Sequence, residues 1–224
     1  MAFLFFTASM SILIFANGDL TPGAWLNGYL QQATQLIGAD GGTRHILQLG
    51  LTPDRVIGDL DSLDDKTVAL LRARGVAIER FAAEKDETDL ELALQHALRT
   101  PDVPIVILGA LGGRLDQTLA NILLLAQPQL RGRRIILAAP HERAWLISGS
   151  TEIGGQAGDR VSLIPLGGAV HVVRTTGLAW PLVDETLPVG PTRGVSNRMT
   201  ADLATVVVDR GSLLCIHSEG GWAR

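Results

Sequence analysis

Acidic side chains are concentrated in one short segment of this sequence, where they could bind a metal ion. Eleven of the 23 acidic residues of the 224-residue chain lie in Asp54–Glu91. Asp59 and Asp61 follow the apolar pair Val56–Ile57, so both carboxylates should emerge at the carboxyl end of a strand. Two carboxylates at this spacing on a turn suit Mg²⁺, which prefers oxygen ligands and also binds substrate phosphates. An Asx turn before a helix that begins near Asp64 would explain the same residues equally well.

A second acidic motif lies further along the same segment. Asp86 is followed by Asp89 three residues later and then by an apolar run. This spacing is typical of a helix N-cap residue and the acidic residue that pairs with it in a capping box. Capping does not explain why Lys85, Glu87 and both aspartates gather at one helix start. Because like charges at this spacing repel each other, a bound cation or a protonated partner would relieve the repulsion. We therefore favour a functional role for this motif.

Two glycine-rich loops could hold the anionic partner of such a cation. Ala39–Arg44 and Gly109–Asp116 each follow an apolar run and open a helical pattern. Glycine lets the backbone approach a ligand closely, and a helix N-terminus offers free N–H groups to phosphate oxygens. Arg114, directly after two glycines, could contact the same anion through two hydrogen bonds. Tight strand-to-helix turns need glycine anyway, but cation-binding turns and anion-binding loops on one sheet edge together indicate a site for a metal-bound polyphosphate.

Composition and charge exclude several other classes of protein. Hydrophobic residues make up 46% of the chain, enough for a packed core, and the net charge of −4 gives no basic footprint for nucleic acid. The single cysteine, Cys215, rules out a disulfide framework and a cysteine-based zinc cluster, and fits a reducing compartment. The sequence has no Walker A, GxGxxG, HExxH or GxSxG motif. Their absence removes the P-loop, common dinucleotide-binding, zincin and serine-hydrolase interpretations.

The amino-terminal segment Met1–Gly18 carries no charge. It lies at the lower edge of a membrane-spanning length, contains polar side chains and precedes the first basic residue, Arg44. We therefore expect neither a membrane span nor an export signal. We expect instead a buried first strand in Ser11–Ala16, preceded by an apolar extension, with Met10 as an alternative start of translation.

Up to about residue 140, short aliphatic runs alternate with helical patterns. The predicted strands are Ile12–Phe15, Leu36–Ala39, Arg55–Ile57, Val76–Ile78, Ile105–Leu108 and Ile135–Leu137. Helical spacing predicts two buried helix faces, formed by Leu90, Ala93, Leu94, Ala97 and Leu98, and by Leu119, Ile122, Leu123 and Ala126. The alternation predicts an α/β domain with a mostly parallel, Rossmann-like sheet and helices on both faces. In such a sheet the ligand site forms at the carboxyl ends of the strands.

The pattern changes after about residue 140. Glycine- and proline-rich turns then separate short strand-like runs, and no long amphipathic stretch is present; the clearest runs are Arg160–Pro165, Val170–Val173, Leu203–Val208 and Leu213–His217. This spacing is typical of a smaller all-β domain, a sandwich or a barrel. We therefore predict two domains, an α/β domain at 1–140 and an all-β domain at 141–224.

In these motifs the sequence resembles the thiamine pyrophosphokinase family. The segments that carry the resemblance occur in the family's order between about Ile12 and Ile216, so both predicted domains take part. None is specific alone, but the combination is. They are Ala39–Gly42, Ile57–Ser62, Lys85–Glu91, Leu111–Asp116, Thr118–Asn121, Ser162–Leu166, Thr176–Leu182 and Ser196–Asn197.

The resemblance implies transfer of pyrophosphate from ATP to the hydroxyethyl oxygen of thiamine, which gives thiamine diphosphate and AMP. It implies Mg²⁺ as cofactor and a homodimer whose active site lies between the α/β domain of one subunit and the β domain of the other. We expect a cytoplasmic enzyme, because ATP is supplied there, and neither a nucleic-acid nor a membrane partner.

The family's site residues are carried over by matching position. The metal and phosphate site, which carries the catalysis, would contain Asp59, Asp61, Asp86, Asp89, Arg114 and Asp116, with Asp59, Asp61 and Asp86 as metal ligands and Asp86 or Asp116 as proton acceptor. The nucleotide would be held by Asp40, Gly41, Gly42, Thr43, Gly112 and Gly113, and the thiamine pocket would be lined by Ser196 and Asn197. Val195 and Arg198 stand where the family often has threonine and an acidic residue.

Two other functions fit parts of the pattern. One is a nonenzymatic sensor of nucleotides or thiamine phosphates with the same fold. The intact acidic residues argue against it, because a sensor would not need so many metal-binding carboxylates. The other is a diphosphokinase that acts on a pterin alcohol, against which the loop at Ser196–Asn197 argues more weakly.

Overall fold

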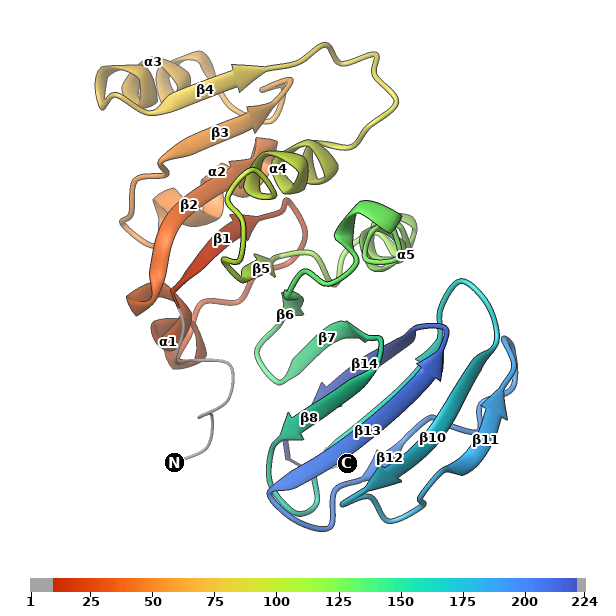
Figure 1. The fold of residues 1–224 in the computed structure, drawn as a ribbon. Helices are drawn as coiled ribbons and strands as arrows, with labels where there is room; N and C mark the ends of the chain where they lie inside the picture. The colour runs from red at the N-terminus through yellow and green to blue at the C-terminus, as the bar shows by residue number, and fades with distance from the viewer. Residues whose placement is uncertain (1–9, 221–224) are drawn as a thin grey trace. The chain divides into compact units, whose positions relative to one another are not determined.

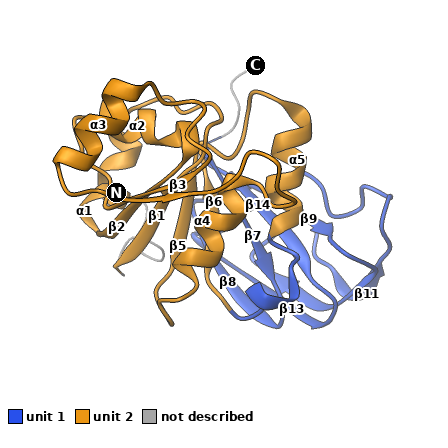
Figure 2. Ribbon diagram, turned by 90° about the horizontal axis from the view of Figure 1, so that it is seen from above, with its two compact units in different colours: residues 1–8, 125–132, 141–224 blue, residues 9–124, 133–140 orange. Residues whose placement is uncertain are grey.

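The computed structural model describes residues 10–220 (Figure 1). The expectations for the apolar extension, Met1–Ser9, therefore lie outside the described residues. The described chain forms two compact units, coloured separately in Figure 2. The first contains residues 10–124 and 133–140, and the second contains 125–132 and 141–220.

The first unit is built on six parallel strands, and all six strands predicted from the aliphatic runs are present. Their order is β6-β5-β1-β2-β3-β4. Every residue of β1, β5 and β6 is buried, as expected for strands covered on both faces. The strands are β1 (Ser11–Phe15), β2 (Ala33–Ala39), β3 (Arg55–Gly58), β4 (Ala77–Arg80), β5 (Ile105–Leu108) and β6 (Ile135–Ala138).

Helices connect these strands. They are α1 (Asn27–Gln31), α2 (Thr43–Gln48), α3 (Asp65–Ala73), α4 (Asp89–Ala97) and α5 (Leu115–Leu124), with short 3₁₀ turns η1 (Ala24–Leu26) and η2 (Asp40–Gly42) in the first unit and η3 (Pro128–Leu130) in the second. Asp64 caps α3, where its Oδ1 accepts a hydrogen bond from the Thr67 amide at 2.7 Å. Asp86, whose spacing is typical of an N-cap, does not cap the next helix. Thr88 caps α4 instead, because its hydroxyl lies three residues before the Glu91 amide and accepts from it at 3.2 Å.

The periodicity argument is right for α4 and wrong for α5. Four of the five residues of the predicted apolar face, Leu90, Ala93, Leu94 and Ala97, are buried, and the fifth, Leu98, follows the helix and is partly buried. The helix packs on β1, β2 and β3. In α5, by contrast, Leu119 and Leu123 are about half exposed, and Leu115 at the start of the same face is 81% exposed. Helical spacing shows that α5 has an apolar face, but it does not show what covers that face.

Apart from the short 3₁₀ turn η3, the secondary-structure elements of the second unit within residues 125–132 and 141–220 are all strands. Its strands form two antiparallel groups, in the orders β12-β9-β14-β7 and β11-β10-β13-β8. The alternation of buried and more exposed residues along β9 and β13 gives each group one buried face. The strands are β7 (Glu142–Ile147), β8 (Ser150–Gly154), β9 (Arg160–Pro165), β10 (Val170–Thr176), β11 (Val183–Leu187), β12 (Asn197–Arg198), β13 (Leu203–Arg210) and β14 (Leu213–Ser218).

The expectation of a mostly parallel sheet holds for the first unit but not for the sheets as a whole. Within residues 10–220 the strands form one mixed sheet of ten strands and one antiparallel sheet of four. The antiparallel part of the mixed sheet consists of β7, β9, β12 and β14. The short connections 148–149 and 211–212 join β7 to β8 and β13 to β14, which belong to different sheets. The antiparallel pairs of the mixed sheet, such as β14 with β7 and β9, therefore form between strands that are distant in the sequence.

No helix among residues 10–220 is both long enough and apolar enough to cross a membrane. All of the predicted metal and phosphate residues lie in the first unit.

Candidate active site

Five loops of the first unit enclose a cavity of about 760 Å³. Four of the loops follow the carboxyl ends of β1, β2, β3 and β5, and the fifth precedes α4. This is the edge at which parallel α/β sheets bind their ligands. The polar side chains that line the cavity are Asn17, Asp19, Asp40, Asp59, Asp61, Ser62, Lys85, Glu87, Thr88, Asp89, Arg114, Gln117 and Asn121.

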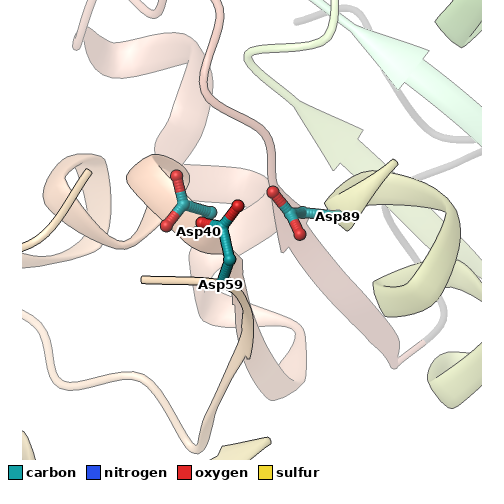
Figure 3. Close-up of side chains that lie close together, drawn as sticks. All are labelled: Asp40, Asp59 and Asp89. Carbon is teal, nitrogen blue, oxygen red and sulfur yellow. The ribbon is translucent and has the colours of Figure 1, made fainter. Parts of the chain in front are cut away.

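Three carboxylates converge in this cavity. One oxygen each from Asp40, Asp59 and Asp89 lies within 4.8 Å of the other two, and Figure 3 shows the three groups facing one another. Asp40 is only 5% exposed, and its Oδ1 is buried without a hydrogen-bond partner among the described residues. A buried carboxylate oxygen without a partner is costly, and a hard divalent cation with oxygen ligands would satisfy it. The three residues, which we call the acidic trio, therefore fit a divalent cation.

The backbone around the trio is shaped for this close approach. Gly58, the last residue of β3, has φ +152°, and a Cβ added there would lie 2.8 Å from the Cβ of Asp40 and 3.1 Å from the Cγ of Asp89. Asp40 and Leu60 have positive φ values of 43° and 69°. Residues other than glycine rarely adopt such values, and those that do cluster at functional sites.

The pKa of Asp89 reflects the crowding of negative charge in the acidic trio. Burial, reinforced by the charges of Asp40 and Asp59, raises the pKa of the Asp89 carboxyl above its ordinary value, although Lys85 opposes the shift. The Lys85 ammonium lies 3.0 Å from Oδ1 of Asp89 and 3.9 Å from Oδ2 of Asp59. In the absence of a metal ion the trio thus carries more negative charge than its surroundings favour.

We expect Asp89→Asn to make the metal-free protein more stable while it removes a proposed cation ligand. Since the folded-state pKa of Asp89 lies above 3.8, the folded state binds more protons than the unfolded state just above that pH, and stability falls as pH rises through this range. At neutral pH the ionised carboxylate therefore costs stability, which the neutral amide avoids. Thermal unfolding in EDTA should give a higher Tm for the variant.

Glu87→Gln is the matched control, because Glu87 also lines the cavity but is not part of the trio. It removes one negative charge without relieving the crowding among the three carboxylates. An equal rise in Tm for both variants would trace the effect to net charge instead of to the trio.

Arg114 and Asp116 form an exposed pair at the glycine-rich loop after β5. Asp116 accepts hydrogen bonds from Nε of Arg114 at 3.1 Å and from Nη2 at 2.6 Å, and these bonds lower the pKa of its carboxyl. Arg114 lines the cavity but Asp116 does not. Gly112 and Gly113 also line it, with positive φ values of 89° and 72°.

Of the remaining predicted residues of the first unit, only some line the cavity. Asp61 lines the cavity, where its Oδ1 accepts from the Ser62 hydroxyl at 3.1 Å, whereas Asp86 is not among the lining residues. Neither predicted proton acceptor therefore lines the cavity. Gly41, Gly42 and Thr43 are buried beneath it, and Thr43 packs against Gly38 of β2. The structure thus brings together Asp40, Asp59 and Asp89 from three different motifs.

Several cavity residues were absent from the predicted set, notably Asn17, Asp19, Lys85 and Asn121. Asn17 and Asp19 directly follow β1, so the strand-end argument that selected Asp59 could also have selected them. Asn121 donates to the carbonyl of Ala110 at 2.9 Å and so ties α5 to the glycine-rich loop. No sequence signal distinguishes that role from ordinary packing.

Arg44 joins two of the cavity loops. Its guanidinium donates to Oδ1 of Asn17 at 3.0 Å and to the carbonyl of Ser62 at 3.1 Å. The loop after β1 and the acidic turn after β3 are therefore held by one side chain from the first turn of α2.

The predicted thiamine-side residues lie in the second unit. Ser196 has φ +59°, and its amide donates to the Ser162 hydroxyl at 3.0 Å. Asn197 is buried and exchanges two hydrogen bonds with the backbone of Trp180. Trp180 itself is 55% exposed, with the guanidinium of Arg198 5.9 Å from its ring centroid. Asn197 therefore positions an exposed aromatic ring.

Comparison with known proteins identifies the family. The family description "Thiamin pyrophosphokinase, catalytic domain" matches residues 26–137, which include the acidic trio, and "Thiamin pyrophosphokinase, vitamin B1 binding domain" matches residues 150–213. The chain belongs to the thiamine pyrophosphokinase family. The first match ends close to the end of β6, and the second begins with β8.

Relatives of this family match along almost the whole chain. The thiamine pyrophosphokinase of Bacillus subtilis is 33% identical over 93% of this chain and 98% of its own. The crystal structure of the Bacillus subtilis thiamine pyrophosphokinase covers 94% of this chain and 100% of its own, with a TM-score of 0.83 and 31% identity. The corresponding structure from Geobacillus thermodenitrificans covers 96% and 100%, with a TM-score of 0.81 and 29% identity.

Proposed function

We propose that this thiamine pyrophosphokinase family member transfers the pyrophosphoryl group of ATP to the hydroxyethyl oxygen of thiamine. The hydroxyl loses its proton, its oxygen bonds to the β-phosphorus of ATP, and the bond from that phosphorus to the bridging oxygen of AMP breaks. The products are thiamine diphosphate and AMP. The convergence of Asp40, Asp59 and Asp89 in the cavity carries the proposal, because such transfers depend on positioning and on compensation of phosphate charge.

The acidic trio is the proposed holder of Mg²⁺. When bound, Mg²⁺ supplies charge compensation for the phosphate oxygens. The partnerless Oδ1 of Asp40 supports this residue as a ligand, and its place in the trio favours it over Asp86. Asp61, two residues after Asp59, also lines the cavity but is not part of the trio, and its Oδ1 accepts a hydrogen bond from the Ser62 hydroxyl.

The loop after β5 is the proposed phosphate-binding element. The backbone at Gly112 and Gly113 faces the cavity without side chains, so phosphate oxygens have access to it. Arg114 is paired with Asp116. Both side chains are largely exposed, so exchanging this pair for a phosphate contact costs little.

The proposed thiamine-binding surface lies in the second unit, near Ser196, Asn197 and Trp180. An exposed tryptophan fixed by Asn197 is suited to stack on a heteroaromatic ring. We further propose a homodimer in which this surface faces the acidic trio of the partner. The exposed leucines of α5, Leu115, Leu119 and Leu123, support an interface, because apolar patches of this kind mark protein contacts.

The shared site predicts complementation between two inactive variants. A subunit with Asp59→Asn lacks the cation site, and one with Trp180→Ala and Ser196→Ala lacks the thiamine surface. In a mixed dimer one of the two composite sites keeps both halves intact, so up to about half of the wild-type activity per dimer should return. Activity is measured after co-expression with two different affinity tags.

Mixing two preparations of the same inactive variant is the control and should restore nothing. A monomer at micromolar concentration by sedimentation, or no activity in the tagged heterodimer, would contradict the shared-site arrangement.

The reaction itself is tested by its products. With ATP, Mg²⁺ and thiamine, thiamine diphosphate and AMP should accumulate in equal amounts, as measured by chromatography. A pterin alcohol in place of thiamine should give no AMP. Release of ADP, or binding of both substrates without product, would overturn the proposal. Because ATP is the co-substrate, we propose the cytoplasm as the place of this reaction.

A further inference from the structure

One ammonium group lies inside the acidic cavity. The Lys85 side chain is 13% exposed, lies 3.0 Å from Asp89 and 3.9 Å from Asp59, and donates to the carbonyl of Ala82 at 3.1 Å. The sequence contains one other lysine, Lys66, on the exposed surface of α3. A lysine this strongly buried needs a negatively charged partner, and here it has two.

This contact is not part of the helix that follows. Lys85 precedes the cap residue Thr88, so its pairing with the first residue of α4 is not a helical ion pair. Nor is the contact limited to Asp89, because the same ammonium lies 3.9 Å from Oδ2 of Asp59, which is outside α4. A simple role in capping or in stabilising α4 therefore does not account for it.

The position of the ammonium conflicts with that of a metal ion. Lys85 contacts Asp59 and Asp89 of the trio, while Oδ1 of Asp40 has no hydrogen-bond partner within residues 10–220. A divalent cation bound by all three carboxylates would lie next to the positive charge of Lys85, and like charges at such short distances repel each other. A lysine side chain has a flexible four-carbon stem and three N–H donors, so its ammonium can change partner without movement of the backbone.

We propose that Lys85 is an internal counter-ion of the cation site, which releases Asp59 and Asp89 when the divalent cation binds and then contacts the polyphosphate of the nucleotide. This inference rests on the proposed function. It implies that Lys85 weakens binding of the cation alone and strengthens binding of the nucleotide that follows. Lys85 is thus a residue that couples the two ligands.

The test compares Lys85→Met with the matched control Lys66→Met. Binding of Mn²⁺ alone is measured by electron paramagnetic resonance, and binding of a non-hydrolysable ATP analogue at saturating Mn²⁺ is measured by calorimetry. For Lys85→Met we expect Mn²⁺ to bind about tenfold more tightly or better, because a repulsive charge is gone, and the analogue to bind about tenfold more weakly. Lys85→Arg should keep both affinities close to wild type, and Lys66→Met should change neither.

If Lys85 had only a structural role, the changes in Tm and in the two affinities would differ from those expected above. Loss of an ion pair that only supports the fold would lower Tm and weaken both ligands, and this result, or unchanged Mn²⁺ affinity, would overturn the inference. Should Lys85→Met fail to fold, Lys85→Gln tests the same loss of charge. These measurements need neither thiamine nor turnover, so absence of product in the assay above would reject the proposed reaction separately. Loss of Mn²⁺ binding in Asp59→Asn confirms that the signal comes from the trio.

Discussion

Asp59→Asn and Asp40→Asn are each expected to lower kcat/KM for thiamine by about a hundredfold or more. Each substitution replaces an anionic ligand of the proposed cation site by a neutral amide of the same shape. The loss falls on the transition state, where phosphate charge must be compensated, so it should appear as several kcal/mol of activation free energy. The fold should survive, because the substitution relieves repulsion within a trio that holds three carboxylates within 4.8 Å.

Asp86→Asn is the control for this prediction. Asp86 belongs to the same acidic motif but does not line the cavity, so its substitution should change kcat/KM by less than about threefold. Circular dichroism and Tm verify folding of all three variants. A large loss in Asp86→Asn together with small losses in the other two would move the cation site away from the trio.

Gly58→Ala should abolish most activity and also destabilise the protein. An alanine Cβ would lie 2.8 Å from the Cβ of Asp40, at a φ of +152° that alanine rarely adopts. Crowding of this kind typically costs about 1–3 kcal/mol in unfolding free energy beyond the backbone strain. Because Asp40 and Asp89 must move apart to admit the methyl group, the trio would be displaced, and a displacement of about 1 Å can cost about a hundredfold in rate.

Gly168→Ala separates the two effects. Gly168 has nearly the same φ, +156°, but a Cβ there would meet nothing within 4 Å. Urea unfolding should therefore show a smaller loss of stability for Gly168→Ala, and its activity should be unchanged. Equal destabilisation of both variants, with activity retained in Gly58→Ala, would show that Gly58 is needed only for its backbone angle.

Sequence patterns located the strands of the first unit well, because a short aliphatic run lies in or directly beside each of them. The burial of Leu90, Ala93, Leu94 and Ala97 in α4 followed from periodicity for the same reason. In α5 the same reasoning was wrong. An apolar face requires a covering surface, and the spacing of leucines within one helix does not reveal whether that surface lies in the same chain.

The acidic trio could be anticipated only in part. Asp59 was predicted to be a cation ligand because it follows a buried strand, whereas Asp40 was assigned to the nucleotide and Asp89 to the metal and phosphate site without being named a ligand. Their proximity depends on the neighbouring positions of β2 and β3 in the sheet and on the packing of α4 against both. Spacing along the chain carries no such information, and it cannot show that Asp61 turns toward Ser62 instead of toward the trio.

The antiparallel strands of the mixed sheet were not foreseen because the change in pattern after residue 140 resembles the start of a separate domain. The short turns 148–149 and 211–212 each join strands of two different sheets, so the length of a turn does not specify which sheet a strand joins. Sheet membership is decided by long-range backbone pairing, to which short runs of alternating residues contribute little.

The central claim, that Asp40, Asp59 and Asp89 hold the cation on which the reaction depends, is tested most directly by anomalous diffraction. Crystals grown with Mn²⁺ and a non-hydrolysable ATP analogue should show one anomalous peak about 2.0–2.3 Å from a carboxylate oxygen of each of the three residues, in contact with the phosphates. A peak coordinated by Asp86, or an acidic trio still paired with Lys85 while the nucleotide and Mn²⁺ are bound elsewhere, would contradict the account.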